Sequence, residues 1–156
     1  MVQAIPAGYT GVTAYLIIRN AARALEFYKK AFGATEVLRL AGPDGSIGHA
    51  EFRIGDGHVM LADEKIDMGY RGPESLGGSP VGLMFYVKDA DACFAQALAA
   101  GATVKQAIKD QFYGDRSGTV TDPFGYDWTI ATHTEDIPAD EMQRRIAAMM
   151  ASGQDA

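Results

Sequence analysis

The stretch SGTVTDPFGYDWTIATH, residues 117–133, decides the fold of this chain. It predicts two strands joined by a sharp reversal, because both of its ends are rich in β-branched and aromatic side chains. The turn is expected at the DPFG segment, where Pro123 lacks a backbone donor and Gly125 can adopt positive φ. The stretch is therefore typical of a β-hairpin.

The same layout occurs earlier in the chain. Residues 51–61, EFRIGDGHVML, also place glycine between two extended runs, and Gly57 precedes Gly125 by 68 positions. Further segments repeat at an offset of 68 or 69, namely residues 18–20 with 87–89 and residues 32–35 with 100–103. Chance similarity would not keep this register over several elements, so the sequence predicts two copies of one structural module.

Each copy is expected to contain a strand, a helix and three more strands. In the first copy Asn20 suits a helix N-cap, apolar residues follow at helical spacing, and Gly33 ends the helix. Asp89 and Gly101 take the same places in the second copy. We therefore expect an α+β fold with two repeated βαβββ modules. The chain is assigned as a single domain with module one at residues 10–63, a linker at 64–80, module two at 81–134 and a C-terminal helix at 137–152.

The segments outside the modules carry two further expectations. The linker is rich in glycine and shows no periodicity, and it is expected to fold partly over a binding face. The C-terminal helix carries apolar residues such as Met142 and Ile146, which are expected to dock it on the body of the chain or on a partner chain.

Composition excludes several classes of protein. The 156 residues are 47% hydrophobic and 22% charged, which is typical of a globular domain. A net charge of −6 without a basic cluster argues against a nucleic-acid partner. No apolar run approaches the roughly 20 residues that a membrane-spanning helix needs. The lone Cys93 cannot form an internal disulfide, which agrees with a cytoplasmic protein.

Several segments carry a family resemblance. Together with the paired modules, these segments resemble the vicinal oxygen chelate superfamily, the group of glyoxalases, bleomycin-resistance proteins and extradiol dioxygenases, and within it the PhnB-like branch. The segments are LEFYKKAFGA (25–34), IGHAEFRIGDGHVMLADE (47–64), DQFYGDRSGTVTDPFG (110–125), DPFGYDW (122–128) and WTIATH (128–133). The likeness spans residues 10–134. It implies two cupped four-stranded sheets forming a half-open barrel, helices on the convex side, a small-molecule ligand in the concavity and a homodimer.

Metal-dependent members of this superfamily take one ligand, His, Gln or Glu, from the first and last strand of each module. The resemblance places these positions at Thr13, near Leu61, near Gly82 and at Thr129. None of them supplies a good imidazole or carboxylate ligand for a divalent transition metal, and Asp127 lies two residues from the expected position. We therefore expect no metal and no cofactor.

Alternation along the strands predicts which side chains line the concavity. In the strand at residues 49–54 the apolar residues should pack under the helices, which turns His49, Glu51 and Arg53 the other way. The same rule, with the loop before the hairpin, gives the remaining candidates. The predicted ligand-binding residues are Thr13, Tyr15, His49, Glu51, Arg53, Met84, Tyr86, Phe112, Tyr113, Arg116 and Thr129.

Each candidate also has a structural interpretation. His49 is a candidate general base that Glu51 could orient, but the pair is equally consistent with a solvated strand face or a structural ion pair. The PhnB-like pattern has a histidine at the position of His49 and often a second one where this chain has Met84. Arg116 is either an anion-binding residue or the partner of Asp115 in a local salt bridge.

Three functions stay open at this point. The first is a cytoplasmic, dimeric, metal-independent protein that binds a small, partly aromatic or amphipathic molecule, in the manner of antibiotic-sequestering relatives. The second is a metal-dependent lyase, isomerase or dioxygenase whose chelate uses His49, Glu51 and Asp127. The third is a metal-free acid–base enzyme that uses His49. The fold alone does not choose among these functions.

Overall fold

The computed structural model describes residues 2–153, which form two four-stranded sheets and four α-helices. The strand order is β1-β4-β3-β2 in one sheet and β5-β8-β7-β6 in the other. In each sheet the first and last strands of the module pair in parallel, and the other pairs are antiparallel. The elements are β1 (Ala14–Ile18), α1 (Ala21–Phe32), β2 (Thr35–Ala41), β3 (Ile47–Ile54), β4 (Gly57–Asp63), the 3₁₀ helix η1 (Ile66–Met68), α2 (Pro73–Leu76), β5 (Gly82–Tyr86), α3 (Ala90–Ala100), β6 (Thr103–Asp110), β7 (Asp115–Thr121), β8 (Asp127–His133) and α4 (Ala139–Ala151).

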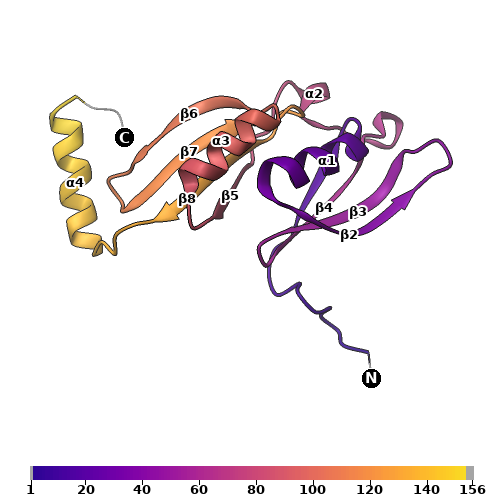
Figure 1. The fold of residues 1–156 in the computed structure, drawn as a ribbon, viewed down its shortest axis with the longest axis horizontal. Helices are drawn as coiled ribbons and strands as arrows, with labels where there is room; N and C mark the ends of the chain where they lie inside the picture. The colour runs from indigo at the N-terminus through magenta and orange to yellow at the C-terminus, as the bar shows by residue number, and fades with distance from the viewer. Residues whose placement is uncertain (1, 154–156) are drawn as a thin grey trace.

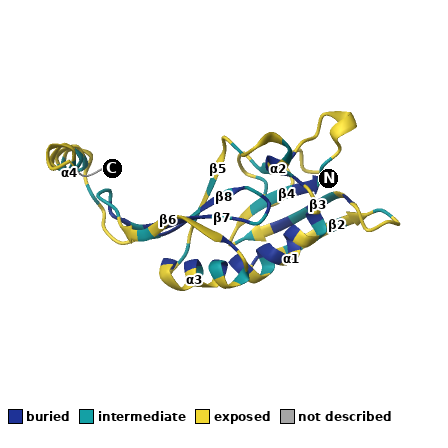
Figure 2. Ribbon diagram, turned by 90° about the horizontal axis from the view of Figure 1, so that it is seen from above, coloured by how far each residue is buried: buried dark blue, intermediate teal, exposed yellow. Residues whose placement is uncertain are grey.

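The two modules lie side by side along the long axis of the molecule (Figure 1). Helices α1 and α3 lie on the same side of the two sheets, and both sheets are open (Figure 2). The predicted α+β fold of two βαβββ modules with a C-terminal helix is confirmed.

The predicted caps define both long helices. The side chain of Asn20 accepts a hydrogen bond from the backbone N–H of Arg23, and Gly33 ends α1 with a φ of 65°. Asp89 does the same for α3, accepting from the N–H of Ala92 at 2.9 Å. Because a polar N-cap satisfies an otherwise unpaired donor, these two residues fix where each helix begins.

Strand alternation divides each sheet into a core face and an open face. Phe52 of β3 is buried under α1, where its ring stacks on Tyr28 with the centroids 5.0 Å apart. Trp128 and Ile130 of β8 are buried in the same way in module two. The predicted division is confirmed, because His49, Glu51 and Arg53 alternate with the buried Ala50 and Phe52.

A buried carboxylate in the DPFG turn joins the modules. Asp122 is 4% exposed, and its Oδ1 accepts from the backbone N–H groups of Phe124 at 2.9 Å and Tyr126 at 3.0 Å. Its Oδ2 accepts from the Tyr28 hydroxyl at 2.8 Å and from the Trp128 indole at 2.9 Å. Tyr28 belongs to module one and Trp128 to module two, so the predicted turn also fastens one module to the other.

Helix α4 projects from the far end of module two (Figure 1). Arg145, in the middle of the helix, pairs with Glu135 at 2.9 Å and donates to the carbonyl of Phe112 at 3.4 Å. None of the 13 residues of α4 is buried, so the helix adds nothing to the core of the same chain. Within residues 2–153, no helix combines the length and apolar character that crossing a membrane requires.

Candidate functional site

The linker between the modules forms a fixed loop at the end of module one. The backbone N–H of Gly72 donates to the Glu64 carboxylate at 2.7 Å, which ties the two ends of the loop together. Gly72 also passes so close to β1 that a Cβ there would lie 2.7 Å from the carbonyl oxygen of Ile17. Between these ends, Lys65 and Tyr70 exchange two backbone hydrogen bonds of 2.9 and 3.0 Å. The loop is therefore held by its own backbone.

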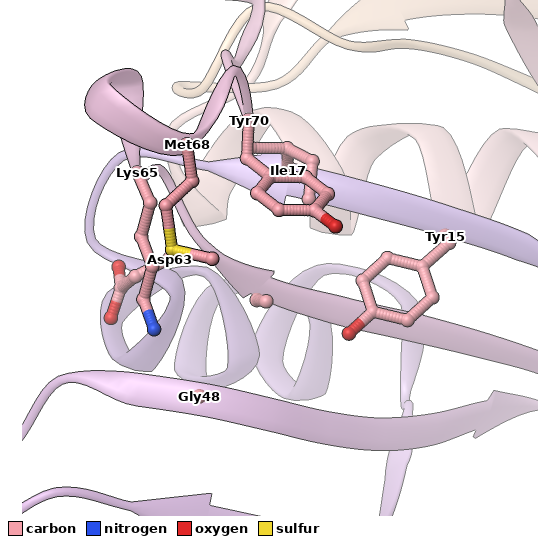
Figure 3. A pocket seen from close by; sticks show the side chains of 8 residues that line it. Tyr15, Ile17, Gly48, Asp63, Lys65, Met68 and Tyr70 are labelled. Atoms are coloured by element: carbon pink, nitrogen blue, oxygen red, sulfur yellow. The ribbon is translucent and has the colours of Figure 1, made fainter.

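A cavity of about 420 Å³ lies between this loop and the open face of module one (Figure 3). Its lining residues come from β1, β3, β4 and the loop, and they are Tyr15, Ile17, Gly48, Ala62, Asp63, Lys65, Met68 and Tyr70. The volume falls in the range of small-molecule sites, about 300–1,000 Å³, and most of the lining is aromatic or apolar. We call this cavity the Tyr15 pocket.

Tyr15 connects this pocket to a hydrogen-bonded chain of side chains, which we call the His49 cluster. The Tyr15 hydroxyl lies 2.9 Å from Nδ1 of His49, and Nε2 of His49 lies 2.9 Å from the Glu51 carboxylate. The hydroxyl of Tyr9, from the N-terminal arm, donates to the other oxygen of Glu51. The Tyr9 ring also packs against His58, with 4.4 Å between the centroids. The arm thus closes the cluster on the side away from Tyr15.

The charges in the His49 cluster fix the direction of its hydrogen bonds. The hydrogen bonds from His49 and Tyr9 lower the pKa of Glu51, and the bond to Glu51 raises the pKa of Tyr9 to about 12. Since an ionised Glu51 only accepts, Nε2 of His49 carries a proton, and in the neutral ring Nδ1 accepts from the Tyr15 hydroxyl. Both nitrogens of His49 are occupied, so the oxygen of Tyr15 is the part of the cluster that borders the pocket.

The predicted site residues form two groups, one on each sheet. Thr13, Tyr15, His49, Glu51 and Arg53 belong to module one, and only Tyr15 among them lines the Tyr15 pocket. The candidates of module two are Met84, Tyr86, Phe112, Tyr113, Arg116 and Thr129. The structure does not gather the predicted residues of one chain into one site.

On the open face of module two, a second cluster surrounds a buried carboxylate. Asp115 is 4% exposed and accepts from the Tyr86 hydroxyl at 2.7 Å, while its other oxygen lies 2.8 Å from Nδ1 of His133. Nε2 of His133 lies 2.9 Å from Asp136. These carboxylates raise the pKa of His133, and the hydrogen bonds of the cluster hold the end of β8 against the start of β7.

The predicted location of Arg116 over the concavity is wrong. Its guanidinium pairs with Asp91 of α3 at 2.5 and 2.7 Å and with Asp110 at 3.1 Å, on the helix side of the sheet. The predicted local pair with Asp115 is also wrong, because Asp115 bonds Tyr86 and His133 instead. Strand β7 begins at Asp115, earlier than the sequence suggests, so alternation turns the next residue to the opposite face.

Sequence reasoning missed the residues that the linker and the arm contribute. Lys65, Met68 and Tyr70 line the Tyr15 pocket, and Tyr9 completes the His49 cluster. The available signal was the large apolar residues at positions 66, 68 and 70 within a glycine-rich stretch, because exposed apolar side chains gathered on one loop are typical of a binding surface.

Comparisons with known proteins identify relatives of the chain. Residues 10–130 match the sequence family described as the Glyoxalase/Bleomycin resistance protein/Dioxygenase superfamily. The uncharacterized protein Mb0911c of Mycobacterium bovis is 46% identical over 142 residues, which cover 89% of this chain and 91% of that protein. The uncharacterized protein At5g48480 of Arabidopsis thaliana is 32% identical over 115 residues, 69% of each chain.

Solved structures show the same architecture. The X-ray structure of At5g48480 from Arabidopsis thaliana has a TM-score of 0.65 at 29% identity, covering 79% of this chain and 98% of that one. The crystal structure of TioX from Micromonospora sp. ML1 has a TM-score of 0.62 at 25% identity, covering 83% and 100%. A PhnB protein from Bacillus cereus has a TM-score of 0.62 at 18% identity, covering 79% and 99%, which shows a shared fold alone.

Proposed function

Because the chain belongs to the glyoxalase/bleomycin resistance protein/dioxygenase superfamily, we propose that it binds a small, partly aromatic organic molecule in the Tyr15 pocket. The observation that carries the proposal is the fixed loop, which places Met68 and Tyr70 opposite Tyr15 and gives the open face of module one a second wall (Figure 3). Aromatic and thioether side chains favour flat, apolar ligands. In this proposal the protein acts in the cytoplasm and sequesters its ligand.

The proposed binding does not use a metal, because the four chelating positions of the superfamily carry poor ligands in this chain. Thr13 and Thr129 offer hydroxyls, and Gly82 offers no side chain. Leu61 is fully buried on the core side, so its neighbour Met60, which pairs with Glu51 across the strands, takes the open-face position. Hydroxyls and a single thioether do not fit a divalent transition metal.

The alternative chelate of His49, Glu51 and Asp127 is not assembled within one chain either. Asp127 belongs to the other sheet, where it accepts from Thr121 at 2.7 Å and pairs with Lys105. Across residues 2–153, no three His, Cys, Asp or Glu side chains form a group suited to a metal ion. The absence of a metal stays a prediction. We expect Zn²⁺, Ni²⁺ or Mn²⁺ to leave the melting temperature unchanged. A saturable shift of the melting temperature at stoichiometric metal would contradict metal-independent binding.

The binding proposal is tested with a neutral aromatic probe, 2-naphthamide, titrated by calorimetry. Replacing Tyr70 with Ala removes one ring from the pocket, and we expect binding to weaken by about 10-fold. Met68→Ala should also weaken binding, whereas Met84→Ala is the matched control, an exposed methionine on the open face of module two. An equal loss from Met84→Ala, or no binding by the wild-type protein, would contradict the proposal.

A second candidate function is metal-free acid–base catalysis, favoured by the chain from Tyr15 through His49 to Glu51. Tyr15 would take a proton from the substrate while its own hydroxyl proton passes to Nδ1 of His49, and the imidazolium would be paired with Glu51. The test is hydrogen exchange at the acidic C–H of small keto compounds in D₂O. Exchange that is lost in Tyr15→Phe supports this function, and no exchange by the wild-type protein excludes it for those substrates.

We also propose that the protein is a homodimer. Leu38 and Leu40 of β2 face the same side as Glu51 and His49 and are 40% and 56% exposed. On module two, Tyr86 is 59% exposed on its open face. Apolar patches of this kind on a monomer mark association surfaces. Helix α4 supports the same conclusion, because a 13-residue helix without a single buried residue is marginal in water unless a partner surface covers it.

A further inference from the structure

We propose that the Tyr15 pocket selects aromatic acids, with the ring between Tyr15 and Tyr70 and the anionic group at Lys65. This inference rests on the proposed binding function and names the chemical class of its ligand. It follows from the balance of charge in the pocket, which contains one cation and one carboxylate whose surroundings differ.

The carboxylate already has its partners. Asp63 accepts hydrogen bonds from the backbone N–H of Ala21 at 2.7 Å and from that of Ile47 at 2.5 Å. Ala21 is the first residue of α1, so its N–H belongs to the positive end of the helix dipole. The charge of Asp63 is therefore compensated by fixed backbone groups, one on each oxygen, before any ligand arrives.

The cation has no such partner. Lys65 makes no ion pair of 4 Å or less with any residue from 2 to 153, although it lines the pocket beside Asp63 (Figure 3). The two backbone hydrogen bonds between Lys65 and Tyr70 place both side chains on the same short loop above the pocket. Lys65 is exposed, and its charge helps to lower the pKa of Asp44 without a direct ion pair. An anion that enters the pocket can therefore accept a charge-assisted hydrogen bond from this ammonium group.

The walls define the rest of the ligand. Tyr15 and Tyr70 are each about half exposed and come from different elements, and Met68 lies beside Tyr70 on the loop (Figure 3). Because the Tyr15 hydroxyl is engaged with His49, its ring is held in place and offers apolar surface to the pocket. A planar aromatic group suits these rings, and an acidic substituent suits Lys65.

The net charge of the chain makes the prediction specific. At −6 the protein as a whole repels anions, so a preference for an acid must come from a local cation. A pocket that only collects apolar molecules would favour the neutral form of the same aromatic compound. Tighter binding of the acid therefore indicates selection by a local cation, and tighter binding of the neutral compound indicates a pocket that only collects apolar molecules.

The experiment compares 2-naphthoate with its neutral analogue 2-naphthamide by calorimetry at pH 7. We expect the wild-type protein to bind the acid about 10-fold more tightly than the amide, as for one charge-assisted hydrogen bond in a partly open site. Lys65→Gln should remove this preference, so that the variant binds the acid and the amide with similar affinity. Lys88→Gln is the matched control, because Lys88 is an exposed lysine that lines a cavity on module two.

The outcomes separate this inference from the proposed function. If the amide binds as tightly as the acid, or if Lys65→Gln keeps the preference, the selection of acids is wrong while binding in the pocket stands. If neither compound binds the wild-type protein, both proposals fail. Loss of the preference in Lys88→Gln would also overturn the assignment to Lys65.

Discussion

Replacing Asp122 with Asn tests the buried carboxylate that fastens the two modules. The side chains have nearly the same shape, but the amide offers one accepting oxygen where the carboxylate offers two. If the amide oxygen of the substituted side chain accepts from the two backbone N–H groups, the NH₂ group of the same amide faces Tyr28 and Trp128. The Tyr28 hydroxyl can turn and accept, whereas the Trp128 indole can only donate and loses its partner.

The expected loss follows from these contacts. An unpaired buried donor costs about 1–3 kcal/mol, and each remaining bond loses the extra strength of a charged acceptor, about 1 kcal/mol. Removing the ionised group offsets part of this loss, since burial raises the pKa of Asp122. We expect the free energy of unfolding to fall by about 2–4 kcal/mol. For a chain of this size, that lowers the melting temperature by about 10 °C.

The assay is urea unfolding followed by the fluorescence of Trp128, the single tryptophan of the chain. The matched control is Asp56→Asn, the same chemical change at an exposed turn residue, which should stay within about 0.5 kcal/mol of the wild type. A midpoint and slope equal to those of the wild-type protein for Asp122→Asn would show that the four donors do not stabilise the fold as described.

Three further perturbations test other parts of the structure. Hydrogen bonding by Arg39 and Lys29 lowers the pKa of Glu36 from 4.5 to about 2, so its stabilisation is present above pH 4.5 and is lost as the pH falls toward 2. In Glu36→Gln, the free energy of unfolding measured by urea titration should fall less steeply between pH 4.5 and 2 than in the wild-type protein. The same steepness in both proteins would contradict this role of Glu36. Tyr9→Phe removes a hydrogen bond that lowers the pKa of Glu51. The pKa of Glu51, followed by carbon NMR, should therefore rise in this variant. An unchanged pKa would mean that the N-terminal arm does not hold Glu51. Ile146→Glu should convert the proposed dimer to a monomer in sedimentation experiments. The control is Ala148→Glu, a substitution at an exposed position of the same helix, which should leave the dimer intact. A dimer that survives Ile146→Glu would exclude α4 from the interface.

The parts of the fold that local chemistry controls were predictable. The DPFG turn, the caps Asn20 and Asp89 and the repeat at an offset of 68 or 69 each depend on residues close in sequence. The sequence predicted the turn at Asp122, but it did not show that Tyr28, 94 positions earlier, donates to its carboxylate. Such long-range contacts leave no local periodic signal.

The candidate site was predictable only where strands contribute to it. Alternation placed Tyr15, His49 and Glu51 on one open face. Alternation failed at Arg116, because the face of the sheet on which this side chain lies depends on where β7 begins. The first residue of β7 was not predictable from the sequence. The linker residues Lys65 and Tyr70 were not found, since their location depends on contacts that the loop makes with itself.

A crystal structure of the protein with 2-naphthoate is the decisive measurement for binding in the Tyr15 pocket, because it locates the ligand without reference to affinity. We expect electron density for the naphthalene ring between Tyr15 and Tyr70, with the carboxylate within hydrogen-bond distance of Nζ of Lys65. Density elsewhere in the molecule at saturating ligand, or an empty Tyr15 pocket, would contradict it.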